Sequence, residues 1–298
     1  MKSIFIKLLI AIPVIYLALF IGLWSSVSDT RPIISLLDMM RSDGSTKIID
    51  FSSDEEKSSK PKPKPNKDKN PYYGDLHVHT KHSFDAYIFG VTATPNDAYR
   101  YAKGEGIMHP MGYEMKLKEP LDFYSVTDHG FFMGMMNAWA DTSTDISQND
   151  FALPFHNLNK EENLTVESAG PRSALFSTIL AGTIATTHGN FHPNTLKAWL
   201  TKNTQKALKS FDYDIHKSAW EDVARSANEH NDPGHFTTFI GYEFTTSTNV
   251  EGGNLHRNVI FNSSKAPIRP WTRIDSINPE DLWTWQDKLR DKGVDTVA

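Results

Sequence analysis

Two histidines, His77 and His79, stand two residues apart in the segment DLHVHT. In a β-strand successive side chains point to opposite faces, so both imidazoles would share one face, close enough to bind one metal ion. The chain contains 12 histidines in 298 residues, however, and a pair of this kind also arises by chance at that composition. Two incidental strand histidines are therefore the alternative interpretation.

Three further polar clusters interrupt or end apolar segments. Asp128 and His129 follow an apolar run, at the end of the strand where α/β barrels place catalytic residues. Glu243 lies within another apolar run, and a buried carboxylate needs a cation or a hydrogen-bonding partner. His256 offers a further ligand, and Arg257 offers a clamp for an anion. The alternative interpretations are a turn for Asp128 and His129, an edge strand for Glu243, and a surface cluster for His256 and Arg257.

The composition limits the chemistry and the partners. The chain has no cysteine, so a metal must be held by His, Asp or Glu, and such ligands suit Zn, Mn or Fe. Lys and Arg number 31 against 36 Asp and Glu, a formal net charge of −5. Because there is no basic excess, we expect no nucleic-acid partner.

Apolar runs and helix-capping signals divide much of the chain into alternating strands and helices. Thr94 before Pro95, for example, is typical of a helix N-terminus. This alternation predicts an α/β domain, of which a barrel is one form. Residues 131–235 are mostly polar and helix-favouring, and we interpret them as a long insertion between two strands. Strands are expected at 75–80, 121–127, 237–244, 256–261 and 294–298, and helices at 95–103 and 279–292.

The N-terminus has the pattern of a membrane-targeting segment, residues 1–30. Lys2 and Lys7 precede an apolar run from Leu8 to Trp24, which is long enough to cross a hydrocarbon core of roughly 30 Å as a helix. We expect an uncleaved inner-membrane anchor with the main domain outside, in the periplasm. A cleaved signal peptide followed by secretion is the alternative.

Residues 31–70 have the composition of a stalk. They contain the acidic run 54–56 and the repeat KPKPKP at 60–65. Proline at alternate positions cannot join a helix or a central strand, so this segment is expected to be an extended, solvated spacer. The folded domain is expected to span residues 71–298.

Taken together, the motifs DLHVHT, TDH, GYE and LHRN resemble those of the PHP (polymerase and histidinol phosphatase) superfamily. The chain is more similar still to an exported domain-of-unknown-function family, number 3604. The likeness covers about residues 71–298. It includes the segments 73–80, 120–123, 231–234 and 279–283.

The resemblance implies a distorted parallel (β/α) barrel with two or three divalent metal ions at one mouth. In that family pattern Glu243 matches a carboxylate that bridges two metals, and Asp128 looks like a partner of the ligand that follows it. The implied metal ligands are His77, His79, Asp85, His129, Glu243 and His256.

The chain departs from the superfamily pattern at its end. The superfamily supplies another histidine after a later strand and an Asp-x-His pair after the last one. The sequence stops at residues 295–298, about where the strand before that histidine would begin. We therefore expect a fragment of a longer protein or a natural truncation, with the final barrel strands missing.

The expected activity is metal-assisted hydrolysis of a small anionic substrate, by default a phosphoester. Two metals roughly 3.5–4 Å apart would bind an anionic oxygen and lower the pKa of a bound water. Glu243, Asp128 and Arg257 are the expected catalytic residues, with Arg257 holding the phosphate. The alternatives are an amidohydrolase-like enzyme that cleaves a C–N or ester bond and a membrane-anchored, non-catalytic binding domain.

Overall fold

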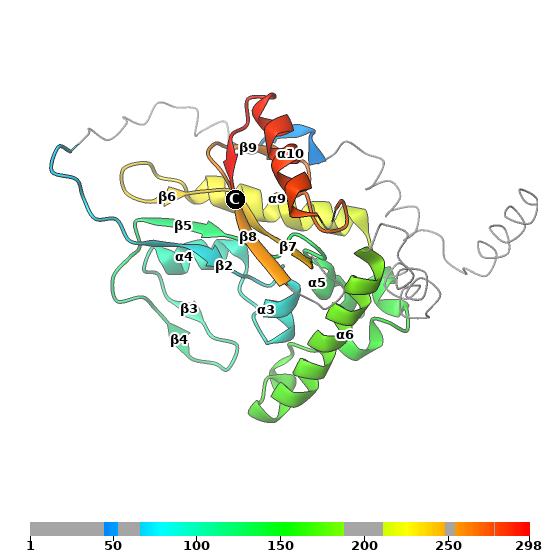
Figure 1. Cartoon of the computed structure of the whole chain (residues 1–298). Helices are drawn as coiled ribbons and strands as arrows, with labels where there is room; N and C mark the ends of the chain where they lie inside the picture. The colour runs from blue at the N-terminus through cyan, green and yellow to red at the C-terminus, as the bar shows by residue number, and fades with distance from the viewer. Residues whose placement is uncertain (1–44, 53–65, 188–210, 248–253, 277) are drawn as a thin grey trace, which may run out of the picture.

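The centre of the fold is a three-stranded parallel sheet in the order β2-β5-β6 (Figure 1). Its strands are β2 (Gly74–Val78), β5 (Phe123–Val126) and β6 (Thr237–Thr238), each at a place where the sequence predicts a strand. Parallel neighbours require long connections, and helices lie in both of them. The computed structural model describes residues 45–52, 66–187, 211–247, 254–276 and 278–298.

A second, antiparallel sheet adjoins the first. It contains β7 (Gly241–Ser247), β8 (Asn254–Phe261) and β10 (Thr296–Val297) in the order β10-β8-β7. The predicted strand at 237–244 is thus two strands, because the chain passes there from the parallel sheet to the antiparallel one. A single parallel bridge between His129 and Glu243 joins the end of β5 to β7.

The described strands do not form the expected parallel barrel. They belong to separate sheets of two or three strands, including a small hairpin of β3 (Ile107–Met108) and β4 (Glu114–Met115). The strand predicted at 256–261 is confirmed as part of β8, but it runs antiparallel to β7, whereas the implied barrel requires a parallel strand there. Only six residues separate these strands. A parallel crossover needs about a dozen or more, so a hairpin is the connection that this length permits.

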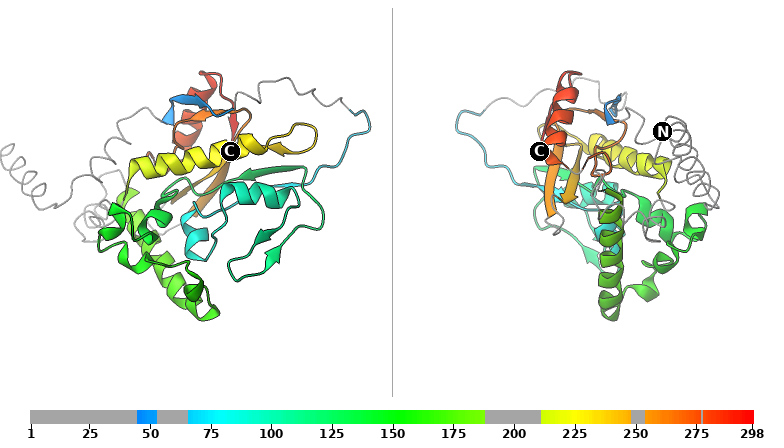
Figure 2. Two further views of the ribbon diagram at one scale, coloured as in Figure 1. Left: turned by 180° about the vertical axis from the view of Figure 1, so that it is seen from behind. Right: turned by 45° about the vertical axis from the view of Figure 1, so that its right-hand side comes forward.

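Two predicted helices are confirmed, and each begins at its capping signal. The Thr94 side chain caps α4 (Pro95–Ala102) in a capping box, and Asn278 caps α10 (Pro279–Arg290). Both helices start with proline, which fits the first turn because its amide would be unpaired there. A third helix, α9 (Tyr213–His230), packs along α4 and also contacts β5 and β6 (Figure 2).

The region predicted as an insertion has two parts that pack differently. Its first part contains α5 (Met135–Ala140), four short 3-10 helices and α6 (Ala169–Thr187). Side chains of this part form an aromatic core with α3 (Phe84–Ile88), around Trp139. In contrast, α9 buries most of its apolar face in the main core, although Tyr213 and Ile215 near its start pack against the aromatic core. The four 3-10 helices span Asp145–Gln148, Leu153–Phe155, Glu161–Asn163 and Val166–Ser168.

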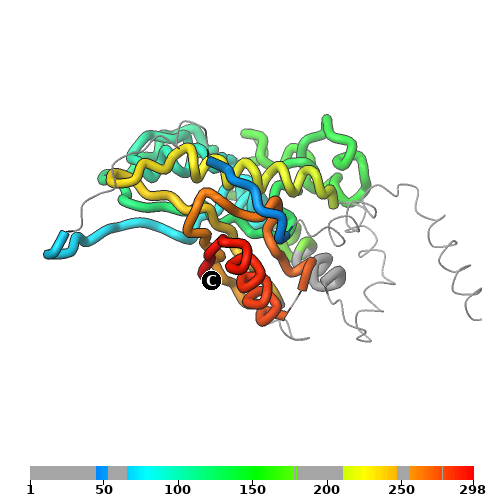
Figure 3. The backbone as a smooth tube through the Cα atoms, turned by 90° about the horizontal axis from the view of Figure 1, so that it is seen from above, coloured from blue at the N-terminus to red at the C-terminus, as the bar shows by residue number. Residues whose placement is uncertain are grey.

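Part of the predicted stalk belongs to the folded domain instead. Residues 48–50 form β1, which pairs antiparallel with β9 (Lys265–Pro267). Trp220 of α9 donates to the Pro267 carbonyl at 2.7 Å, and Trp285 of α10 donates to the Ser45 carbonyl at 2.6 Å. The β1–β9 ribbon therefore lies between α9 and α10 (Figure 3). Unlike the side chains of a spacer, Phe51 is buried in the main core, and the partly buried Ile48 and Ile49 pack against that core.

The predicted membrane anchor, residues 1–30, and the Lys-Pro repeat at 60–65 lie outside the described residues. Within the described ranges, none of the helices combines the length and the apolar character needed to cross a bilayer.

Buried His216 in α9 predicts a loss of stability in acid. Burial lowers the pKa of His216, and the nearby Arg269 lowers it further, to about 3, from the usual 6.5. Below about pH 6.5, His216 therefore binds a proton in the unfolded chain but stays neutral in the folded chain. The free energy of unfolding consequently falls as the pH drops. Relative to His216→Leu, the wild type should lose about 2 kcal/mol more between pH 7 and 5.

Urea unfolding at both pH values measures this difference. His235→Leu, at an exposed position, should keep the wild-type pH dependence. Parallel stability curves for the wild type and His216→Leu would contradict the expectation.

Candidate metal centre

The metal-binding side chains predicted from the sequence meet where β2 and β5 end beside the β7–β8 hairpin. The Asn258 side chain of β8 donates to the Leu76 carbonyl of β2 at 2.8 Å and holds the two sheets together at this point. The cluster contains three groups of side chains that can hold a metal ion, with the ligand atoms of each group within 4.8 Å of one another. The groups are His77, His79 and Glu243; His79, Asp85 and His129; and His129, Glu243 and His256.

Strand alternation places most of these side chains. His77 and His79 share a face, with ring centroids 5.2 Å apart. In the hairpin, Thr245 pairs with His256. Residues directly opposite in an antiparallel pair share a face, and so do residues two apart on one strand. Glu243 therefore points to the same side as His256.

Glu243 is the centre of the cluster. Its Oε2 atom lies 2.8 Å from Nε2 of His79 and 3.2 Å from Nε2 of His77. Its Oε1 atom contacts Nδ1 of His256. The carboxylate is 1% exposed, so it is surrounded by imidazoles in place of water. The two oxygens thus face different histidines, which is the arrangement of a carboxylate able to bridge two cations.

Asp85 and His129 extend the cluster toward α3. Asp85 Oδ1 lies 3.2 Å from Nδ1 of His79, and Asp85 Oδ2 lies 3.4 Å from Nε2 of His129. Since Asp85 is in the first turn of α3, the Ser83 N-cap and the helix start fix where its carboxylate lies. The six predicted ligands are therefore brought together.

The geometry and one unpaired atom fit a bound cation. Ligands at roughly 2.0–2.2 Å from a zinc-like ion lie roughly 3–3.5 Å from each other, close to the separations around Glu243 and Asp85. In addition, Nε2 of His79 is buried and makes no hydrogen bond within the described part of the chain, although Glu243 Oε2 is 2.8 Å away. Two ligand atoms this close with no hydrogen bond between them are the arrangement expected of side chains that share one cation.

The electrostatics of the cluster are strongly coupled. Burial alone would raise the pKa of Glu243, but its contacts with His79, His129 and His256 lower the pKa to about 2. Burial alone would lower the pKa of His79, but Asp85 and Glu243 outweigh it and raise the pKa to about 10. Without a metal, His79 thus carries a proton at neutral pH. A metal ion would have to displace that proton.

Asp128 is in none of the three groups. It is fully buried, and burial raises its pKa. Its carboxylate accepts the backbone amide of Thr80 and, at 2.7 Å, the Thr80 hydroxyl. Asp128 therefore anchors the backbone just after His79 and helps to hold that histidine in place in the cluster.

Arg257 is not brought into the cluster. It pairs with Phe244 in the hairpin, and Phe244 is part of the main core. Because side chains alternate along a strand, Arg257 points to the face opposite that of His256. The prediction that Arg257 holds a substrate phosphate at the cluster is therefore wrong.

Two hydroxyl groups that the sequence interpretation missed orient the histidine ligands. The Ser83 hydroxyl lies 2.9 Å from Nδ1 of His79 and donates to Asp85 Oδ1 at 2.5 Å. The Thr245 hydroxyl lies 2.7 Å from Nδ1 of His129. By occupying the Nδ1 atoms they leave the Nε2 atoms for a metal. Thr245 stands two residues after Glu243 on the same face of the strand. This spacing is the one feature of the sequence from which its place in the cluster could have been predicted.

Removing either hydroxyl is expected to weaken metal binding by about 10–100-fold, because groups that fix ligand orientation carry affinities of this size. Ser83→Ala and Thr245→Val test this in a competition titration against a chromogenic chelator. Ser173→Ala, exposed on α6, is the matched control. Wild-type affinity in both cluster variants would show that the hydroxyls do not orient the ligands.

Comparison with known proteins places the chain in a family without assigning its chemistry. No curated protein and no solved structure matches it. Residues 66–298 match the sequence model of the family described as "Protein of unknown function (DUF3604)". This match spans most of the chain and includes every side chain of the cluster. The chain therefore belongs to the DUF3604 family.

Proposed function

We propose that this chain carries the metal centre of a hydrolase that activates water with two or three divalent cations to cleave a phosphoester. The observation that carries the proposal is the convergence of four histidines and two carboxylates, one of which is the buried Glu243. The resemblance of its motifs to the PHP superfamily supports the same chemistry.

The cluster has a closed side and an open side. Glu243 and His129 are buried, whereas the side chains of His77 and His256 are 57% and 42% exposed. Water and substrate would therefore reach the centre between His77 and His256. When bound, the cations would bind an anionic oxygen and lower the pKa of a water to about 7.

The residues of the chain hold and orient the centre. Glu243 presents one oxygen to His256 and the other to His77 and His79, so it would link two cations. Arg257 points away, so a substrate anion would be held mainly by the cations themselves. We also propose that residues 1–30 anchor the protein in the inner membrane, with the centre on the periplasmic side.

Substrate class is tested with the full-length protein loaded separately with Zn, Mn and Fe. A phosphomonoester, a phosphodiester, a carboxylate ester and an amide should be assayed beside the double variant His77→Ala/His79→Ala. We expect phosphoester turnover that the double variant lacks. Turnover of the amide or carboxylate ester alone would favour an amidohydrolase-like enzyme. A metal-loaded, folded protein without turnover would favour a binding domain.

A further inference from the structure

Asn258 lies directly across the β7–β8 hairpin from Glu243. The backbone amide and carbonyl of Glu243 do not bond to β8, because they bond to Asp128 and Gly130 at the end of β5. Glu243 and Asn258 therefore form a non-hydrogen-bonded pair, the kind in which opposite side chains lie closest. The Asn258 side chain thus stands beside the Glu243 carboxylate, on the face of the hairpin that carries His256.

The Asn258 amide has one paired end and one unpaired end. Its nitrogen donates to the Leu76 carbonyl at 2.8 Å, and because a carbonyl can only accept, this bond fixes which end of the amide is oxygen. The Oδ1 atom is buried and makes no hydrogen bond within the described ranges. A buried amide oxygen requires a donor or a cation. Nε2 of His79, a predicted ligand atom, has the same two properties.

Three predicted ligands flank this amide. Glu243 is opposite, and His256 stands two residues earlier on the same face of β8. Leu76, which accepts the amide nitrogen, directly precedes His77 in β2. His77 and Glu243 are themselves 3.2 Å apart, between Nε2 and Oε2. A carboxylate cannot donate a hydrogen bond, so a cation shared with Glu243 is the partner that suits the Asn258 oxygen.

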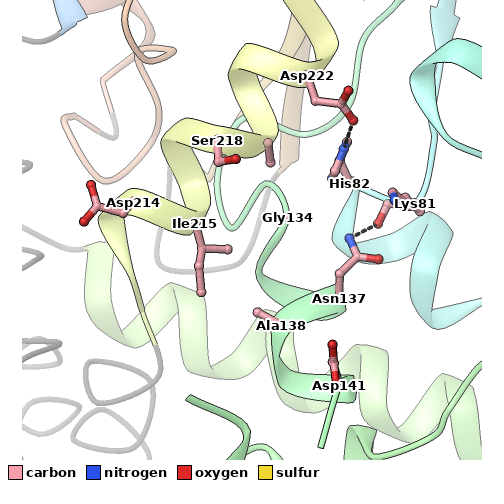
Figure 4. A pocket seen from close by; sticks show the side chains of 11 residues that line it. Lys81, His82, Gly134, Asn137, Ala138, Asp141, Asp214, Ile215, Ser218 and Asp222 are labelled. Atoms are coloured by element: carbon pink, nitrogen blue, oxygen red, sulfur yellow. Dashed lines mark hydrogen bonds and ion pairs between the residues drawn. The ribbon is translucent and has the colours of Figure 1, made fainter. Parts of the chain in front are cut away.

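The loop that follows β2 is held in place by contacts other than that of Asn258. The Asn137 side chain of α5 donates to the Lys81 carbonyl at 2.9 Å (Figure 4). In addition, Nε2 of His82 lies 2.7 Å from the Asp222 carboxylate of α9 (Figure 4). Since α5 and α9 already fix this loop, holding β2 does not by itself account for an amide whose oxygen is buried and unpaired.

We propose that Asn258 is a seventh ligand of the metal centre, with its Oδ1 atom binding the cation held by His77 and Glu243. This role rests on the proposed metal centre but not on the substrate that is cleaved there. An amide oxygen is a hard ligand of the kind that suits Mn²⁺ in octahedral sites, whereas Zn²⁺ is usually satisfied by four ligands. Asn258 would therefore shift the preference of the centre toward Mn²⁺.

The test is a competition titration of the full-length protein with Mn²⁺ and with Zn²⁺ against a chromogenic chelator. Asn258→Leu removes Oδ1 and the bond to Leu76, and we expect Mn²⁺ affinity to fall at least about tenfold and Zn²⁺ affinity to fall by a smaller factor. Asn258→Asp loses the same bond but keeps an oxygen at Oδ1, so it should bind Mn²⁺ at least as tightly as the wild type. Asn262→Leu, exposed just after β8, is the matched control and should bind both metals as the wild type does.

The aspartate variant separates a ligand from a residue that only supports β2. Both Asn258 variants lose the bond to Leu76, so both should unfold at a lower temperature by circular dichroism, but only the leucine variant should lose Mn²⁺ affinity. Equal loss of Mn²⁺ affinity in the two folded variants would overturn the proposal. So would wild-type affinity in folded Asn258→Leu, or equal losses for Mn²⁺ and Zn²⁺. A wild type that binds neither metal would overturn the metal centre and this ligand together, whereas metal binding without phosphoester turnover would contradict the proposed hydrolase alone.

Discussion

Glu243→Gln is expected to lower metal affinity by more than about 100-fold, beyond the loss seen when only an orienting group is removed. The substitution keeps the size of the side chain but removes its charge. It also turns one oxygen, now in contact with imidazole nitrogens of His77, His79 or His256, into an NH₂ group that cannot bind a cation. Hydrolysis should fall with the loss of metal.

Competition with a chromogenic chelator measures this effect directly. Glu229→Gln, exposed on α9, is the matched control and should keep full affinity. If folded Glu243→Gln binds metal as tightly as the wild type, then Glu243 is not a ligand and the bridging role fails.

Replacing either of two buried arginines four residues apart with methionine is expected to change the free energy of unfolding in opposite directions. Arg269 forms a two-pronged ion pair with Asp275, at 2.9 and 2.6 Å. The Asp275 side chain is only 5% exposed and also accepts the Thr272 amide. Arg269→Met leaves that carboxylate without its counter-charge, and we expect the free energy of unfolding to fall by about 3–5 kcal/mol.

Arg273 has no carboxylate partner among the residues that the structure describes. It is 1% exposed, its Nε and Nη2 atoms make no hydrogen bond in the part of the chain described, and burial lowers its pKa to about 10. The Phe131 ring, 5.1 Å from its guanidinium carbon, returns about 2 kcal/mol for a desolvated cation, which is less than the several kcal/mol that burial of an ion costs. Arg273→Met should therefore raise the free energy of unfolding by about 1 kcal/mol or more, because burying an uncompensated charge is costly.

Urea unfolding of the two variants and the wild type, at one pH, tests the pair. Each variant serves as the control for the other, because both replace an arginine with methionine in the same loop. A similar destabilisation in both variants would contradict the assignment of Arg273 as an uncompensated cation.

The sequence predicts those features that follow from local rules. Thr94 and Asn278 cap helices because their side chains reach the free amides of the first turn, and α4 and α10 begin where these residues predict. Alternation along β2 predicts the shared face of His77 and His79. These features depend on neighbours within a few residues.

Features that depend on strand pairing could not be predicted in the same way. The face of Arg257 is fixed by the β7–β8 hairpin, and the expected parallel barrel implied a different pairing. Residues 48–50 resemble a spacer until β9, more than 200 residues later, provides their partner. Ser83 and Thr245 gain a role only through contacts with His79 and His129 in the folded chain.

The metal content of the purified full-length protein, measured by mass spectrometry beside His79→Ala, tests the central claim most directly. His79 belongs to two of the three groups and carries the unpaired Nε2 atom. We predict that the wild type, after exposure to Zn, Mn or Fe, retains near-stoichiometric metal through desalting and that folded His79→Ala retains far less. A folded wild type that retains none of the three metals, or a variant that retains as much as the wild type, would contradict a metal centre at this cluster.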